Sequence, residues 1–241
     1  MRKEYSQIAT ISKIYLSEMR KRFLLCFAFF LIIFFVSFIF SEKIFKIFLD
    51  NFQLKNVQII TTSPFQFFGL SINMALAIAI VLSFPIIVYN IFSFLSPALT
   101  KKEKKCIKKI FFLSIIFFVA GFLFGVTVLE YVLIILAEYN TKVGLVNMWD
   151  IRIFVSQIFL TAALMGIIFQ FPIVISILIK KNIISIKALK RKRKFIIVLA
   201  FIIAALLPPT DGLSLIIMGL FLILIFELTL FYNRKAISKN L

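Results

Sequence analysis

The stretch "FSFLSPALTKKEKKCIKK", residues 92–109, leaves an apolar run, passes Pro97 and enters a patch that holds six lysines and a single acid, Glu103. Apolar runs of about 18 residues or more are long enough to cross the hydrocarbon core of a membrane. One such run precedes the patch, at about residues 67–95, and another follows it, at about 110–137. The patch is therefore expected to be a loop that joins two membrane-spanning helices at one membrane surface.

The same alternation of apolar runs and polar loops continues along the whole chain of 241 residues. The sequence is 62% hydrophobic, contains 32 phenylalanines and has a mean hydropathy of +1.09, which is more apolar surface than a soluble domain of this size can bury. We predict an all-α polytopic membrane protein in which residues 1–241 form a single integral-membrane domain. Its six transmembrane helices are predicted at about residues 23–40, 67–95, 110–137, 151–179, 195–207 and 213–232.

The distribution of basic residues predicts the orientation of these helices. Of the 28 lysines and arginines, 23 lie in residues 1–22, 101–109, 180–194 and the C-terminal tail. Because cytoplasmic loops carry the excess of lysine and arginine, both termini are predicted to be cytoplasmic, which requires an even number of spans. The net charge of +18 would also suit a nucleic-acid binder, but its distribution favours topology signals and anchors on anionic membrane lipid. We therefore expect lipid and no nucleic acid as a partner.

The fifth predicted span is unusually short. Its 13 residues, Phe195 to Leu207, reach about 20 Å as a helix, whereas the hydrocarbon core is about 30 Å thick. The sixth span begins directly after the turn Pro208–Gly212, so the two form a short hairpin whose tip is expected below the outer membrane surface. Alternatively, the fifth helix begins near Lys187 and its lysines reach back to the interface.

Two smaller features complete the predicted fold. The outer segment "SEKIFKIFLDNF", residues 41–52, has apolar residues at roughly helical spacing and predicts a short amphipathic helix on the outer surface. Pro85 and Pro172 lie within the second and fourth predicted spans and are expected to kink them.

The composition excludes several kinds of site. The chain has no histidine, which rules out a histidine-based proton relay, catalytic triad or metal site. Its two cysteines, Cys26 and Cys106, lie near the cytoplasmic ends of predicted spans, where a disulfide is not expected, and their spacing fits no metal motif. No nucleotide-binding motif is present. We predict no catalytic residue, no metal ligand and no cofactor, and we do not expect an enzyme.

Four motifs along the chain share their order with the signatures of one membrane-protein family. They are "YLSEMRKRF" (residues 15–23), "FPIIVYNIFSFLSPALTKKEKK" (84–105), "KRKRKFIIVLAFIIAALLPPTDGLSL" (190–215) and "IFEL" (225–228). Together they cover nearly the whole chain. By these motifs the chain resembles the TatC family, the polytopic receptor subunit of the twin-arginine protein translocase.

The resemblance implies a receptor that binds signal peptides bearing two adjacent arginines and nucleates export of folded proteins across the membrane. Glu18 and Glu103 are implied to accept the arginine pair, because a carboxylate binds a guanidinium through two parallel hydrogen bonds that an ammonium does not offer. The lysines around Glu103 keep that carboxylate ionised and repel a peptide that is merely cationic. In a competing interpretation, Glu103 only makes ion pairs within its own loop. The other signal-peptide-binding residues implied are Arg20, Phe94, Pro97 and Leu99.

The same resemblance implies partners within the membrane. These are small single-span subunits of the TatA and TatB type, packed against the fifth and sixth helices, in an assembly that is both homo- and hetero-oligomeric. Gln170, Asp211 and Glu227 are the intramembrane polar residues implied to contact such partners. Gln170 and Gln66 depart from the family, because both stand where an acid is common, and this argues against a role that needs negative charge at these two positions.

Some alternatives stay open from the sequence. Glu227 lies about two turns inside Arg234. Its carboxylate either snorkels to the cytoplasmic side or pairs with a nearby lysine, or it faces a cavity or a partner. The alternative function is an ion-coupled small-solute transporter, which the lack of inverted repeats and of a clear ionic site at mid-membrane disfavours. A bacterial inner (plasma) membrane is the default location, with an organellar membrane as the alternative.

Overall fold

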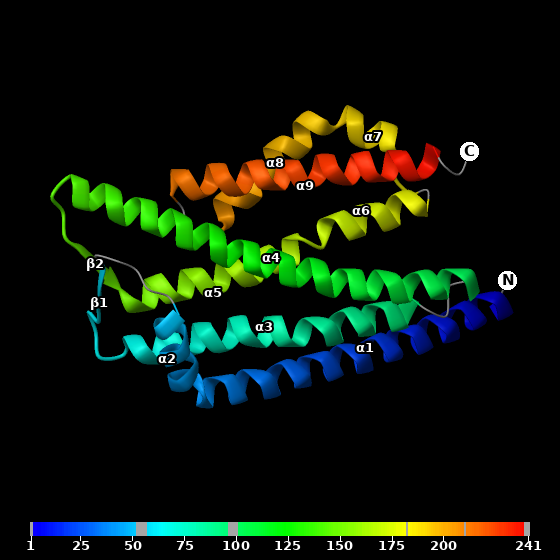
Figure 1. Cartoon of the computed structure of the whole chain (residues 1–241). Helices are drawn as coiled ribbons and strands as arrows, with labels where there is room; N and C mark the ends of the chain where they lie inside the picture. Colours follow the sequence, from blue (N-terminus) through cyan, green and yellow to red (C-terminus); the bar gives the residue numbers. More distant parts are fainter. Residues whose placement is uncertain (1, 52–56, 96–100, 182, 210, 239–241) are drawn as a thin grey trace.

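The computed structural model describes residues 2–51, 57–95, 101–181, 183–209 and 211–238, and it is helical almost throughout (Figure 1). The helices and strands, in chain order, are α1 (Arg2–Ile39), α2 (Ser41–Asn51), β1 (Val57–Ile60), α3 (Gln66–Leu95), α4 (Lys101–Lys142), β2 (Asn147–Asp150), α5 (Ile151–Ile168), α6 (Phe171–Lys180), α7 (Ile186–Arg191), α8 (Arg193–Leu206) and α9 (Gly212–Ser238).

The predicted all-α membrane fold is confirmed. Five helical stretches of the described chain are long and apolar enough to cross a membrane: Ser17–Ile39, Gln66–Phe94, Lys108–Lys142, Ile151–Lys180 and Gly212–Arg234. The sixth, α8, has 14 residues and reaches only about 21 Å. Figure 1 shows both ends of the chain at the same end of the bundle, as the charge distribution predicts. We call this the cytoplasmic end and the opposite one, with α2 and the strands, the outer end.

The short hairpin of α8 and α9 also agrees with the sequence. In Figure 1 the turn between these helices stops short of the outer end that α4 and the strands reach. The alternative start near Lys187 is not how the fifth span forms, because helix α7 covers that position and ends at Arg191, with Lys192 between it and α8. The buried side chain of Leu189 packs α7 against Ile175 of α6 and Leu230 of α9.

The two prolines expected to kink their spans act differently, and the outer loops add a feature that was not predicted. The fourth span is divided into α5 and α6, because Pro172 stands in the first turn of α6 and the chain turns at Phe169 and Gln170. In contrast, α3 continues through Pro85. The outer loops also form a two-stranded parallel sheet, in which Val57–Ile60 pairs with Asn147–Asp150. The sequence did not predict this sheet, because strands of four residues between long helices are too short to show a recognisable pattern.

The helices pack closely where their side chains are small. Helix α5 lies at the centre, in contact with both α3 and α4, while α1 packs on α3 and α9 packs on α8 and α6. A Cβ atom added to Gly125 of α4 would lie 2.8 Å from the Cα of Ala162 in α5, so only glycine allows this approach. Such small-residue contacts are how helices associate in lipid, where apolar burial alone gives no preference. The fully buried core includes Leu70, Met74, Leu129, Val155, Ile158, Met165 and Met218.

Candidate functional site

Glu18 lies on α1 near the cytoplasmic end and is already bound to a guanidinium. Arg22, one helical turn further on, donates two hydrogen bonds to the same carboxylate oxygen, from Nη2 at 2.6 Å and from Nε at 3.1 Å to Oε1. The side chain of Glu18 is 40% exposed and that of Arg22 is 27% exposed, so a ligand can reach the pair. Arg20 and Lys21, on the adjoining faces of the helix, are exposed.

The second oxygen of Glu18 is available. Within the described part of the chain, every hydrogen bond of this carboxylate goes to Oε1, and none to Oε2. A carboxylate has four lone-pair sites and can accept more than one guanidinium N–H. Glu18 therefore keeps acceptor capacity for a second cation while Arg22 stays in place.

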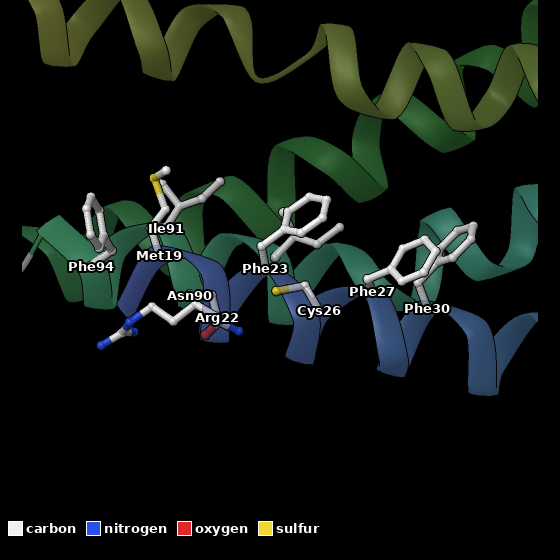
Figure 2. Close-up of a pocket in the computed structure, with 10 residues that line it drawn as sticks. Met19, Arg22, Phe23, Cys26, Phe27, Phe30, Asn90, Ile91 and Phe94 are labelled. Carbon is white, nitrogen blue, oxygen red and sulfur yellow. The ribbon is translucent and has the colours of Figure 1, made fainter. Parts of the chain in front are cut away.

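An open groove lies directly beside this pair, between α1 and α3. Its volume is about 480 Å³, and Phe94, a predicted binding residue, forms part of its wall. Figure 2 shows the labelled side chains of α1, from Met19 to Phe30, alongside those of α3, with Cys26 between Phe23 and Phe27. The lining residues are Met19, Arg22, Phe23, Cys26, Phe27, Phe30, Ile87, Asn90, Ile91 and Phe94.

Three of the predicted binding residues fall outside this description. Pro97 and Leu99 lie outside the described residues, and so does the side chain of Glu103, although its backbone is in the first turn of α4. Figure 1 shows that turn at the same end of the bundle as the N-terminal half of α1. The backbone thus puts Glu103 and Glu18 at one end of the molecule, and their meeting through one peptide stays a prediction.

Gln170 makes hydrogen bonds that suit an amide better than an acid. Its Nε2 donates to the backbone oxygen of Ser114 in α4 at 3.1 Å and to that of Gly166 in α5 at 3.3 Å. An ionised carboxylate has no proton to donate and would face two carbonyl oxygens. The amide thus joins the α5–α6 break to α4 without placing a charge in the bilayer.

Glu227 is paired rather than isolated. Arg193 at the start of α8 donates from Nη2 to its Oε2 at 2.6 Å, which joins the two helices of the short hairpin. The sequence left open a pair with a nearby lysine; the carboxylate is indeed paired, but with an arginine, Arg193. Both side chains stay partly exposed, at 40% for Glu227 and 46% for Arg193.

Asp211 caps the other end of the hairpin. Its Oδ2 accepts the backbone N–H of Ser214 at 2.8 Å, at the start of α9. Thr161 of α5 donates to the backbone oxygen of Pro208, which ties the hairpin tip to the bundle. Within the described residues, Asp211 Oδ1 and the hydroxyl of Ser214 are buried without a hydrogen-bond partner.

A polar cluster at the outer end was not predicted from the sequence. Asp150 caps α5 by accepting the backbone N–H groups of Arg152 at 2.9 Å and Ile153 at 3.2 Å through Oδ1. Its Oδ2 accepts the hydroxyl of Thr62 at 2.8 Å and the amide of Gln66. Burial acts to raise the pKa of Asp150, but these four hydrogen bonds outweigh it and the pKa is lowered. An aspartate directly before a long apolar run is a helix-cap signal that would have identified its first role.

The described residues contain no group of three or more histidine, cysteine, aspartate or glutamate side chains that would hold a metal ion. Three polar sites described above are candidates for binding a ligand or a partner. They are the Glu18–Arg22 pair with its groove, the two ends of the α8–α9 hairpin, and the Asp150 cluster. Of these, only the first combines an open carboxylate oxygen with an open groove.

Comparison with known proteins agrees with this architecture. The family described as "Sec-independent protein translocase protein (TatC)" matches residues 14–220 of the chain. The TatC protein of Aquifex aeolicus is 28% identical over 233 residues, which cover 94% of this chain and 95% of the relative. That of Haemophilus influenzae is 30% identical over 223 residues, covering 91% and 87%.

Solved structures give the same result at the level of the fold. A crystal structure of the twin-arginine translocase receptor TatC, determined in the detergent DDM, matches with a TM-score of 0.80 and 29% identity. The match covers 91% of this chain and 99% of that one. These findings give no support to the alternative of a small-solute transporter, and they describe a family of translocase components rather than of enzymes. The chain is a multi-pass membrane protein that belongs to the TatC family of Sec-independent protein translocase proteins.

Proposed function

We propose that this chain is the membrane receptor of a twin-arginine translocase, which binds leader peptides bearing two adjacent arginines and nucleates export of folded proteins. The observation that carries the proposal is the geometry of Glu18. This carboxylate accepts the guanidinium of Arg22 at 2.6 Å, is partly exposed and keeps Oε2 open at the cytoplasmic end. Membership of the TatC family supports the same function.

The preference for arginine over lysine follows from the acceptor geometry. A guanidinium presents N–H groups in a rigid fork that matches a carboxylate, whereas an ammonium is a compact point charge. We propose that one peptide arginine binds Glu18 and the other binds Glu103, with Arg20, Phe94, Pro97 and Leu99 lining the same surface. The six lysines around Glu103 repel peptides whose charge is not paired with a carboxylate.

We further propose that small single-span subunits of the TatA and TatB type pack against the α8–α9 hairpin. Because α8 is shorter than the hydrocarbon core, a neighbouring apolar helix would cover its exposed side chains, among them Val198 and Ile202. Gln170, Asp211 and Glu227 are the polar residues assigned to this region, and the whole chain acts as one integral-membrane unit. The membrane we propose is a bacterial inner membrane.

The test is binding of a fluorescent twin-arginine peptide to the full chain in lipid nanodiscs. Each hydrogen-bonded contact to a charged group contributes about 1.5–3 kcal/mol, so Glu18→Gln or Glu103→Gln should each weaken binding by about 10- to 150-fold. Replacing both peptide arginines by lysine should have a similar effect. Glu138→Gln, at an exposed acid near the outer end of α4, is the matched control and should leave binding unchanged. Binding at full affinity by the Glu18→Gln, Glu103→Gln double variant would refute the proposal.

A further inference from the structure

We propose that the cytoplasmic end of α8 holds one anionic phospholipid. Its phosphate binds the basic segment 187–194, and the first part of one acyl chain lies in a second groove, between the α5–α6 break, α8 and α9. This inference goes beyond the proposed function and does not depend on it. It assigns a discrete lipid site to a segment whose charge otherwise indicates only a general attraction to the membrane surface.

The basic segment consists of α7 and the start of α8, and Figure 1 shows it at the cytoplasmic end. All six of its cations are exposed: Lys187, Lys190, Arg191, Lys192, Arg193 and Lys194. The sequence has no acid between Asp150 and Asp211, and within the described residues only Arg193 of the six has an ion pair, with Glu227. The segment therefore attracts an anionic headgroup and repels the ammonium group of a zwitterionic one.

Arg193 can bind a phosphate while it stays paired with Glu227. Its Nη2 donates to Glu227 Oε2 at 2.6 Å, and no hydrogen bond within the described residues uses its Nε or Nη1. A guanidinium has five N–H donors in a planar fork, and this fork also fits the oxygens of a phosphate. The side chain is 46% exposed, so a headgroup can reach the unused donors.

The groove begins one helical turn beyond these cations. The backbone N–H of Ile196 donates to the oxygen of Lys192 at 3.1 Å, so Lys192 lies one turn before the first groove residue of α8. The volume of the groove is about 360 Å³, within the range of about 300–1,000 Å³ typical of ligand sites. Its lining includes Val174, Ile196, Leu199, Ile203 and Phe226. The cations thus lie at its cytoplasmic end, as a headgroup next to its acyl chain requires.

The size and chemistry of the groove fit an acyl chain better than a helix. From Ile196 to Ile203 the wall rises about 10 Å, about a third of the hydrocarbon core. A helix of that length, about 10 Å in diameter, fills about 800 Å³, which is more than twice the groove volume. Gln170 is the polar residue of the lining, and its Nε2 already donates to two backbone oxygens. An acyl chain brings no polar group that this wall would leave unsatisfied.

The groove and the face proposed above for single-span partners are different sides of α8. Val198 is 57% exposed and does not line the groove. It is two residues from both Ile196 and Ala200, so at 3.6 residues per turn it projects about 160° away from these two groove residues. A lipid in the groove therefore leaves the partner face uncovered.

The test is binding of phosphatidylglycerol to the full chain in detergent, counted by native mass spectrometry. Phosphatidylcholine with the same acyl chains is the reference lipid, because it has the phosphate but also an ammonium group. Each lysine or arginine near an anionic lipid contributes about a factor of five, so we expect one phosphatidylglycerol to bind at least about fivefold more tightly. Lys192→Gln should weaken this binding about fivefold. Lys21→Gln, which removes an exposed cation of α1 at the same end, is the matched control and should not.

Filling the groove gives an independent readout. Leu199→Trp should weaken binding of phosphatidylglycerol by about tenfold, because the acyl chain loses its buried contacts. Val198→Trp, on the other side of α8, is the matched control and should leave binding unchanged. Equal yield and thermal stability of the two variants would show that both fold. Glycerol 3-phosphate, which has the phosphate and no acyl chain, should not displace the lipid when added in excess.

Glu227→Gln tests the assignment of Arg193. The variant frees the whole guanidinium for the phosphate, so binding of phosphatidylglycerol should become tighter, by up to about fivefold. The gain should be absent in a Leu199→Trp background, because the lipid no longer seats beside Arg193 there. A gain of the same size in both backgrounds would show attraction to the surface charge without a seated lipid.

The outcomes separate the lipid site from its rivals. Equal affinity for the two lipids, or for the Leu199→Trp and Val198→Trp proteins, would overturn it. Displacement by glycerol 3-phosphate would also overturn it, because the site would then bind phosphate alone. If Leu199→Trp abolished copurification of a single-span partner and left lipid binding unchanged, the groove would belong to a partner helix. None of these results bears on the proposed function, which the dependence of peptide binding on arginine tests separately.

Discussion

The contact between Gln66 and Asp150 needs an amide rather than an acid at position 66, and Gln66→Glu tests this explanation. Gln66 is only 8% exposed, and its Nε2 donates to Asp150 Oδ2, the oxygen that also accepts Thr62. A carboxylate at position 66 would lose this bond and set two negative charges against each other. The cluster joins the start of α3 to the start of α5, so its loss should loosen the outer end of the bundle.

The size of the effect follows from two contributions. Losing a hydrogen bond to a charged group costs about 1.5–3 kcal/mol. Two like charges about 4 Å apart add between about 1 kcal/mol, in water, and about 4 kcal/mol, near a protein surface. We expect Gln66→Glu to destabilise the chain by at least about 2.5 kcal/mol at pH 7.5, which corresponds to a fall in Tm of about 5–10 °C for a chain of this size.

The assay is thermal unfolding of the detergent-solubilised full chain, followed by circular dichroism. Gln66→Met, which loses the hydrogen bonds without adding charge, is the control and should be destabilised by about 1.5–3 kcal/mol. In an Asp150→Asn background the repulsion is absent, so Gln66→Glu should cost clearly less than it does in the native background. Equal costs in the two backgrounds would refute the explanation.

The pH dependence gives a second check with a defined sign. In the native chain the pKa of Asp150 is lowered from its ordinary value of 3.8, so its stabilisation is present above that pH and is lost as the pH falls through the lower folded value. In Gln66→Glu the repulsion instead disappears when either carboxylate takes up a proton. The deficit of the variant should therefore shrink as the pH is lowered from 7.5 toward 4.5, and a deficit that is constant over this range would contradict the repulsion.

Three further predictions concern the membrane-embedded part. Gly125→Leu should separate α4 from α5, because even a Cβ atom would lie 2.8 Å from the Cα of Ala162. We expect loss of folded protein in detergent size-exclusion profiles. Leu123→Ile, on the exposed face of α4, is the matched control, and it is a better one than Gly144→Leu in an exposed loop. Gln170→Leu should lower stability by about 1–3 kcal/mol in thermal unfolding, because two backbone oxygens lose a donor in the bilayer. Glu227→Gln should change stability by less than about 1 kcal/mol, since its pair with Arg193 is partly exposed, and a larger loss would show that the pair holds the hairpin together.

Much of the fold could be predicted because the lipid bilayer constrains the length of each apolar helix and the side on which basic loops lie. The apolar run before the 101–109 patch became α3, Gln66–Leu95, within one residue of the predicted span at its start. The charge distribution predicted both termini at one end, where Figure 1 shows them. The shortness of the fifth span, α8, could be read from the 13 residues before the Pro208–Gly212 turn.

The candidate site could be predicted only in part. Family motifs pointed to Glu18, but nothing in the spacing said that Arg22 would bind only one of its two oxygens. The groove between α1 and α3 was not predicted, because a strongly apolar helix has side chains of similar kind on every face, and the pattern does not say which face stays uncovered. Phe94 was assigned by resemblance, and its place in the groove wall came from packing.

The sequence alone determined which segments enter the lipid and which end of the bundle is cytoplasmic, because the free energy of placing apolar and charged residues depends on local composition. The tertiary structure decided which polar side chains find a hydrogen-bond or ion-pair partner. Residues as distant along the chain as Gln66 and Asp150, or Arg193 and Glu227, pair only when separate helices are brought together. Hydrogen bonds act over about 3 Å, so their partners follow from packing geometry that no local pattern contains.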